Sequence, residues 1–248
     1  RNVKPENFMI AVEEITKRGY YVFRMGKKVS TPLNTSNPKV IDYANSNLRS
    51  DFLDIYLGAN CEFYLGSGSG FSSVPYIFRK PLARIVFPLV QATKPDVSQV
   101  ECATGKKNET LFCDFGLSSR NGLTLTKHYF LKEKKKKLTL NEIFLRNLAT
   151  NTKDNYYLEN GIVVKDPSPD EIKEMALEMV DLIENKYVRS QSDDILEEKA
   201  QRIFDQNINS LAFKKKISES FNIKFTHVGK FVGKISNKYL RNNSDWLN

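Results

Sequence analysis

Strand-like and helix-like segments alternate along the first third of the chain, and this order constrains the fold more than any other feature of the sequence. Helical patterns start at Pro5, at Arg49 and after Gly70. Short runs rich in aromatic and β-branched residues cover 20–25, 40–41, 61–65 and 81–87. Such an order is typical of α/β proteins, in which helices connect parallel strands. We therefore expect an α/β fold with a doubly wound, mostly parallel sheet.

Local signals predict several helix ends. Gly19 follows the first apolar helical face, where a C-terminal cap belongs. Thr139 and Ser168 each precede a glutamate by three residues, which is the capping-box pattern that begins a helix. The helix expected over 49–58 carries an apolar stripe that we expect to face inward: Phe52, Ile55 and Tyr56.

The pattern weakens after residue 91. Residues 92–137 lack clear periodicity, so we expect an irregular insertion there, with short strands as the alternative to a long loop. Further helices are expected over 192–204 and near 229–241. The expected organisation is one large domain over 1–187, followed by a C-terminal helical extension over 188–248.

Composition narrows the class of protein. No apolar run approaches the roughly 20 residues that span a bilayer, and three cysteines without CxxC spacing argue against a disulfide framework or a zinc site. We therefore expect a cytoplasmic protein, with peripheral contact at the inner membrane face left open. Because the sequence starts at Arg1 rather than at a methionine, we also expect that an N-terminal part is missing.

Positive charge is in excess, and its densest run is 132–137, which contains five lysines and Glu133. One interpretation of this run is a solvated loop. The other is contact with a phosphorylated lipid acceptor, a membrane surface or nucleic acid. Nucleic acid is disfavoured, because the sequence has no recognisable binding motif and its basic residues do not alternate with aromatic ones.

The segment 66–70 reads Gly-Ser-Gly-Ser-Gly and lies between an expected strand and an expected helix. Glycines let backbone N–H groups approach a phosphate, serines donate hydrogen bonds, and a helix N-terminus attracts anions. The spacing fits neither a P-loop nor a GxGxxG fingerprint, which disfavours NTPases and dinucleotide dehydrogenases. A diphosphate-binding turn and a flexible surface turn are the two interpretations. The candidate binding residues are Gly66, Ser67, Gly68, Ser69, Gly70 and Ser72.

Other candidates lie at neighbouring strand ends. Arg24 and Gly26 end the first strand, and Asp42 ends the second; in parallel sheets, ligands bind along this edge. Arg24 could offset the charge of a leaving diphosphate, or it could be a surface arginine or pair with Asp42 or Asp54. Asp51 and Asp54 share a helix face. They either bind ribose hydroxyls or act as a helix cap and a solvent-facing charge.

Metal and histidine chemistry have little support. The two histidines, His128 and His227, are far apart in the sequence, so we favour a surface or core role for each. The sequence contains no HExxH, no cysteine cluster and no DxD. We expect no metal site and no cofactor.

Several segments carry a resemblance to known proteins: Tyr20–Gly26, Val40–Ala44, Arg49–Ala59, Phe63–Gly70, Leu138–Ile143, Asn160–Ile162 and Ser168–Ile172. They resemble a family of bacterial glycosyltransferases associated with surface-polysaccharide synthesis. That family is similar to the protein O-fucosyltransferases, whose GT-B fold holds a nucleotide sugar mainly in a Rossmann-like C-terminal domain. In those enzymes, a Gly-Ser/Thr turn and a serine-rich helix start contact the donor diphosphate.

The resemblance implies that 1–187 is the donor-binding domain of a GT-B glycosyltransferase. Its donor is then a nucleotide-diphosphate sugar held without an essential metal, and its acceptor is a glycan or a lipid-linked molecule. Asp51 or Asp54 matches an aspartate on the helix before the turn. The resemblance also implies a preceding domain that supplies much of the acceptor site. A non-catalytic nucleotide- or glycan-binding module is the alternative. The residues that match the diphosphate turn by position are Gly66, Ser67, Ser69, Gly70 and Ser72.

Overall fold

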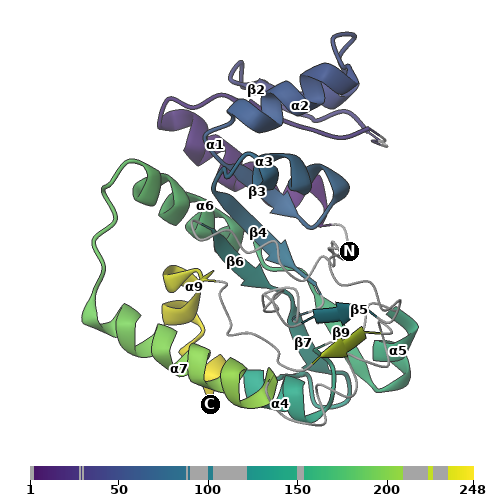
Figure 1. The fold of residues 1–248 in the computed structure, drawn as a ribbon, viewed down its shortest axis with the longest axis vertical. Helices are drawn as coiled ribbons and strands as arrows, with labels where there is room; N and C mark the ends of the chain where they lie inside the picture. The colour runs from purple at the N-terminus through teal and green to yellow at the C-terminus, as the bar shows by residue number, and fades with distance from the viewer. Residues whose placement is uncertain are drawn as a thin grey trace.

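The computed structural model describes residues 3–27, 29, 31–87, 89, 100–102, 122–149, 154–208, 223–225 and 234–248. Within these ranges the chain is an α/β protein built around a parallel sheet. Figure 1 shows this sheet in the middle of the molecule, with α2 (Asp51–Asn60) at one end and α7 (Gln191–Ile208) at the other.

Four short strands form the central sheet, and each is parallel to its neighbours. Their order is β11 (Lys234–Ile235), β6 (Leu123–Thr126), β4 (Leu82–Val86) and β3 (Tyr64–Ser67). Every residue of β4 and β6 is buried, as is usual for parallel strands covered on both faces. In the register, Arg84 lies between Gly66 on one side and Thr124 on the other. The predicted α/β class with parallel strands is confirmed.

A separate pair of parallel strands comes earlier in the chain. It consists of β1 (Val22–Phe23) and β2 (Val40–Ile41), and β2 leads into the short 3-10 helix η2 (Tyr43–Asn45). Before it lie η1 (Pro5–Phe8) and α1 (Met9–Lys17). Gly19 follows α1 with a φ of +98°, a left-handed conformation that favours glycine, so the predicted cap is confirmed.

Helix α2 begins after Ser50, whose hydroxyl accepts the N–H of Leu53. It packs through Gly58 against α3 (Ser73–Ile77), so closely that a Cβ on Gly58 would lie 2.8 Å from Val74 Cγ1. The helix therefore turns its smallest residue toward its neighbour and its apolar stripe outward. The prediction that the stripe faces inward is wrong, because its side chains are 51–73% exposed: Phe52, Ile55 and Tyr56.

A second, antiparallel sheet continues from the first. Its order is β8 (Lys136–Lys137), β7 (His128–Leu131) and β9 (Ile162–Lys165), and only Lys127 separates β6 from β7. Between β8 and β9 lie α4 (Leu140–Leu145) and α5 (Asp154–Glu159). The predicted capping box of Thr139 and Glu142 is present at the start of α4. A further antiparallel pair joins β5 (Val100–Cys102) to β10 (Ile223–Phe225).

The last third of the described chain closes the core. Helix α6 (Pro169–Ile183) begins at the predicted capping box of Ser168 and Glu171, and it packs against α1 and the central sheet. After α7 and β11 come α9 (Asn237–Asn242) and η7 (Ser244–Leu247). Residues 234–248 contribute five side chains to the main hydrophobic core: Ile235, Tyr239, Leu240, Trp246 and Leu247.

The central sheet takes strands from several parts of the expected organisation. Strand β6 lies inside the expected insertion 92–137, yet it forms the middle of the central sheet. Within the expected helical extension 188–248, α7 confirms the predicted helix over 192–204, but β11 pairs with β6 and so joins the sheet of the first region. Of the helix expected near 229–241, α9 forms the end, while 229–233 lie outside the described residues.

Candidate functional site

The glycine- and serine-rich turn follows directly from β3, at the carboxyl end of the central sheet. Gly68, Ser69 and Gly70 are exposed, and Ser67 is half-buried. The chain then enters the 3-10 turn η3 (Gly70–Ser72) and the five-residue helix α3. The predicted strand–turn–helix is present, but the helix is short, so its N-terminus adds less positive potential than a long helix would.

Hydrogen bonds within the turn fix its shape. Ser72 is fully buried, and its hydroxyl donates to the Ser69 carbonyl at 2.6 Å. The Tyr64 hydroxyl donates to the Ser67 carbonyl at 2.8 Å. Ser72 is therefore occupied inside the turn, which leaves the exposed backbone of 68–70 and the Ser67 and Ser69 side chains as the groups nearest to solvent.

The glycines of the turn differ in what surrounds them. A Cβ on Gly66 would lie 2.4 Å from the Tyr64 hydroxyl, so Gly66 is needed for packing. A Cβ on Gly70 would meet no atom within 4 Å. The turn is thus packed on its inner side and open at Gly70, where a ligand could approach the backbone.

Arg24 and Asp42 lie together at the ends of β1 and β2. Arg24 Nη1 donates to the Thr31 carbonyl at 2.6 Å and lies 3.4 Å from Asp42 Oδ1. Asp42 Oδ2 also accepts the Leu33 N–H at 2.9 Å and the Asn45 side-chain amide at 2.7 Å. Burial raises the pKa of Asp42, but these donors outweigh it and hold the pKa below its usual value. Of the interpretations of Arg24, the ion pair with Asp42 is the one observed.

The two α2 aspartates share one arginine. Arg49 Nη2 lies 2.9 Å from Asp54 Oδ2 and 3.6 Å from Asp51 Oδ1. The Asp51 side chain is 82% exposed and also lies 3.8 Å from Lys27 Nζ, which follows the turn at Gly26. Gly26 has a φ of +151°, a value that other residues rarely adopt. Both aspartates lie in the first turn of α2, where negative charge stabilises the helix.

These groups form two local clusters rather than one continuous set of contacts. Arg24 pairs with Asp42, and Arg49 pairs with Asp51 and Asp54, but among the described residues no hydrogen bond or ion pair joins either cluster to the 66–70 turn. One aromatic contact joins the segment before β1, which leads to Arg24, to the segment before β3, which leads to the turn 66–70. Tyr20, just before β1, meets Phe63, just before β3, edge to face with ring centroids 6.5 Å apart.

Sequence reasoning missed Arg84, which lies on β4 opposite Gly66 and is only 3% exposed. Burial raises the pKa of the Tyr64 hydroxyl, and the positive charge of Arg84 opposes part of that rise. Arg84 therefore lies close beneath the turn. A charged residue within the apolar run 82–86 was the available signal, because arginine is rarely buried without a specific partner.

Of the surface and core roles expected for His128, the core role fits its surroundings, since its side chain is 10% exposed and its Nε2 lies 2.8 Å from Glu171 Oε2. His227 lies outside the described residues. Within the described ranges, no group of three or more His, Cys, Asp or Glu side chains is arranged to hold a metal ion. In the same ranges, no helix is both long and apolar enough to cross a bilayer.

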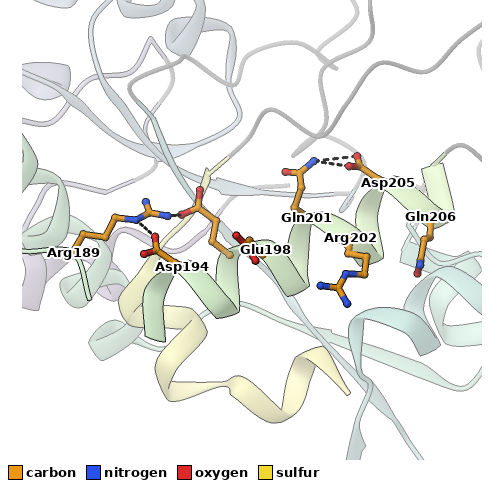
Figure 2. Close-up of a pocket in the computed structure, with 8 residues that line it drawn as sticks. Arg189, Asp194, Glu198, Gln201, Arg202, Asp205 and Gln206 are labelled. Carbon is orange, nitrogen blue, oxygen red and sulfur yellow. Dashed lines mark hydrogen bonds and ion pairs between the residues drawn. The ribbon is translucent and has the colours of Figure 1, made fainter. Parts of the chain in front are cut away.

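A hollow of about 560 Å³ lies elsewhere, along α7 (Figure 2). The described residues that line it all fall between Arg189 and Gln206, and they belong to α7 or to the short segment just before it. Arg189 is paired with Asp194 and, at 2.7 Å, with Glu197. Among the described residues no second element adds a wall, and acidic side chains outnumber basic ones in the lining, so we do not regard this hollow as the candidate diphosphate site.

Comparison of the chain with protein-family models, with curated proteins and with solved structures found no match in any of the three.

Proposed function

We propose that the chain is the donor-binding part of a glycosyltransferase, with a nucleotide-diphosphate sugar held at the turn 66–70. Transfer breaks the bond between the anomeric carbon and the diphosphate, so negative charge grows on the departing group. The acceptor is a glycan or a lipid-linked molecule in surface-polysaccharide or glycoconjugate synthesis, and the protein works in the cytoplasm. The finer fold proposed is a doubly wound, Rossmann-like GT-B C-terminal domain.

The observation that carries this proposal is the contact between Tyr20 and Phe63. Tyr20 lies two residues before β1 and Phe63 lies one residue before β3, so a contact between these two strand starts supports a parallel arrangement with β1 beside β3. With β1 placed beside β3, the two separately paired sheets β1-β2 and β3-β4-β6-β11 combine into the order β2-β1-β3-β4-β6-β11, which reverses between β1 and β3. Ligands of open α/β sheets bind at such a reversal, at the carboxyl ends of the strands. Those ends are Arg24 and the turn 66–70.

Two arginines near these strand ends suit a diphosphate. Among the guanidinium nitrogens of Arg24, only Nη1 makes a hydrogen bond to the described residues, and we propose that Nε and Nη2 contact the diphosphate. Arg84 adds a buried positive charge beneath the turn. Buried or partly buried cations act on a nearby anion more strongly than solvated ones, because water screens them less.

Titration calorimetry with uridine, guanosine, cytidine, adenosine and thymidine diphosphates tests the donor site. We expect one of them to bind, and we expect Gly70→Val to weaken that binding at least about tenfold, since a side chain at Gly70 occupies the open approach. The free energy of unfolding should change by less than about 1 kcal/mol, because the new side chain meets open space. Absence of binding by all five nucleotides at millimolar concentration contradicts the proposal.

One observation favours the alternative of a non-catalytic binding module. Arg24, the residue proposed to offset the leaving group's charge, already donates to Thr31 and pairs with Asp42. A transfer assay on Arg24→Ala separates the two functions. An enzyme loses turnover while still binding nucleotide, whereas a binding module shows no turnover in the unaltered protein.

A further inference from the structure

The lysine run 132–137 forms the tip of a β-hairpin instead of a loose loop. Strands β7 and β8 pair antiparallel, with Leu131 opposite Lys136 and Phe130 opposite Lys137. The Lys132 N–H donates to the Gly161 carbonyl at 2.9 Å, and the Leu138 N–H donates to the Tyr129 carbonyl at 2.7 Å. These bonds fix both arms of the hairpin to the rest of the antiparallel sheet.

The tip presents positive charge to solvent. Residues 132–136 are all exposed, and they comprise four lysines and Glu133. Lys136 is paired with Glu142 at 2.7 Å. In the part of the chain that the structure describes, Lys132, Lys134 and Lys135 form no ion pair. Three ammonium groups are therefore available to an external anion.

The hairpin starts at the same edge of the central sheet as the turn 66–70. β7 starts one residue after β6 ends, so the hairpin begins at the carboxyl edge of the central sheet. β3 runs parallel to β4 and β6 and ends at that same edge in the turn 66–70. In Figure 1, β7 continues beyond the end of β6 toward the lower part of the molecule.

We propose that the hairpin tip 132–136 is a docking surface for an anionic lipid membrane. A compact, convex group of lysines suits a flat surface of many headgroups, and each lysine near such a surface strengthens binding about fivefold. Nucleic acid is favoured less, because proteins that bind it use an extended basic groove with aromatic platforms. Here the nearby aromatic, Phe130, is half-buried, with Lys165 Nζ 4.9 Å from its ring centroid.

Membrane docking does not depend on the donor site, and its test is separate from nucleotide binding. The full chain is sedimented with vesicles of phosphatidylcholine alone and of phosphatidylcholine mixed with phosphatidylglycerol. We expect binding only to the mixed vesicles, weakening as salt is added. In the test variant Lys132→Gln, Lys134→Gln and Lys135→Asn are combined; asparagine is used because residue 135 has a φ of +48°. This variant should bind on the order of 100-fold more weakly.

A matched control removes the same charge from other parts of the surface. Lys4, Lys27 and Lys186 are exposed, and replacing all three by glutamine lowers the net charge equally. The control should retain binding to within about fivefold. Equal losses in both triple variants overturn the proposal in favour of net charge alone. Binding of single-stranded RNA but not of vesicles, lost in the hairpin variant, overturns it in favour of nucleic acid.

Discussion

Glu171 joins three parts of the molecule through one carboxylate. Its Oε2 lies 2.8 Å from His128 Nε2 and accepts the Ser168 N–H at 2.8 Å, while Oε1 accepts the Asn243 amide at 3.2 Å. Burial raises the pKa of Glu171, but the bonds to His128 and Ser168 outweigh it and lower the pKa to about 2 from an ordinary 4.5. A carboxyl whose pKa is depressed by folding stabilises the fold above its unfolded pKa and loses that contribution in acid.

The free energy of unfolding should therefore fall as pH drops from about 4.5 toward 2, with up to about 3 kcal/mol due to Glu171. Glu171→Gln should lower stability at pH 7 and flatten this part of the pH profile, which chemical denaturation at several pH values measures. Asp170→Asn is the control, because this neighbour is 74% exposed and should cost less than about 1 kcal/mol. Identical pH profiles for the unaltered protein and Glu171→Gln contradict this account.

At the scale of elements, α9 depends on a carboxylate from another helix. Six residues are too few for a stable isolated helix. Glu178 of α6 is fully buried and accepts hydrogen bonds from the Ser236 hydroxyl at 2.6 Å and from the N–H groups of Asn237 and Lys238 at 3.1 Å. It thereby satisfies donors that the start of a helix leaves unpaired.

Glu178→Ala should therefore lower the free energy of unfolding by about 3 kcal/mol, because it leaves buried donors without an acceptor. Hydrogen exchange at the Asn237 and Lys238 amides should accelerate in Glu178→Ala. The stability of Glu178→Gln should lie between those of the unaltered protein and Glu178→Ala, because glutamine keeps one acceptor oxygen. Glu174→Ala, one turn earlier on α6 and one-third exposed, is the matched control and should cost less than about 1 kcal/mol. An equal loss in the free energy of unfolding for Glu174→Ala and Glu178→Ala would contradict the role of Glu178 as the cap of α9.

The elements also show what the sequence can predict. The capping boxes at Thr139 and Ser168 were predictable because their hydrogen bonds join residues three apart. The outward direction of Phe52 was not, because periodicity defines a stripe without saying which face approaches a neighbour. β6 was missed because its four residues are too few to establish a period, and its partner strands are distant in sequence.

The candidate site also has features that the sequence predicted and features that it did not. The position of the turn 66–70 at a strand end was predictable from its own glycines and the flanking strand and helix. The sequence did not reveal that the Ser72 hydroxyl donates to the Ser69 carbonyl instead of facing a ligand, because this bond depends on the local fold of the turn. The presence of Arg84 beneath Gly66 depends on the pairing of β3 with β4, and strand register is a tertiary property that composition does not reveal.

At the scale of the whole molecule, the last described segment decides whether the chain folds as one unit. Residues 234–248 bury five large apolar side chains and pair β11 with β6. At about 1.5–3 kcal/mol for each side chain, this burial is comparable to the whole stability of a typical domain, about 5–15 kcal/mol.

Trp246, the sole tryptophan, is 3% exposed and reports directly on this segment. Unfolding in urea followed by its fluorescence and by far-ultraviolet circular dichroism should therefore give coincident transitions. Leu247→Ala should lower the free energy of unfolding by about 2–4 kcal/mol. The urea midpoints of both signals should then fall together. If the Trp246 signal changes at clearly lower urea than the circular dichroism, the C-terminal segment is a separable extension, as the expected boundary near residue 188 implies. A shared transition instead makes β11 and α9 integral to the sheet that ends in the turn 66–70.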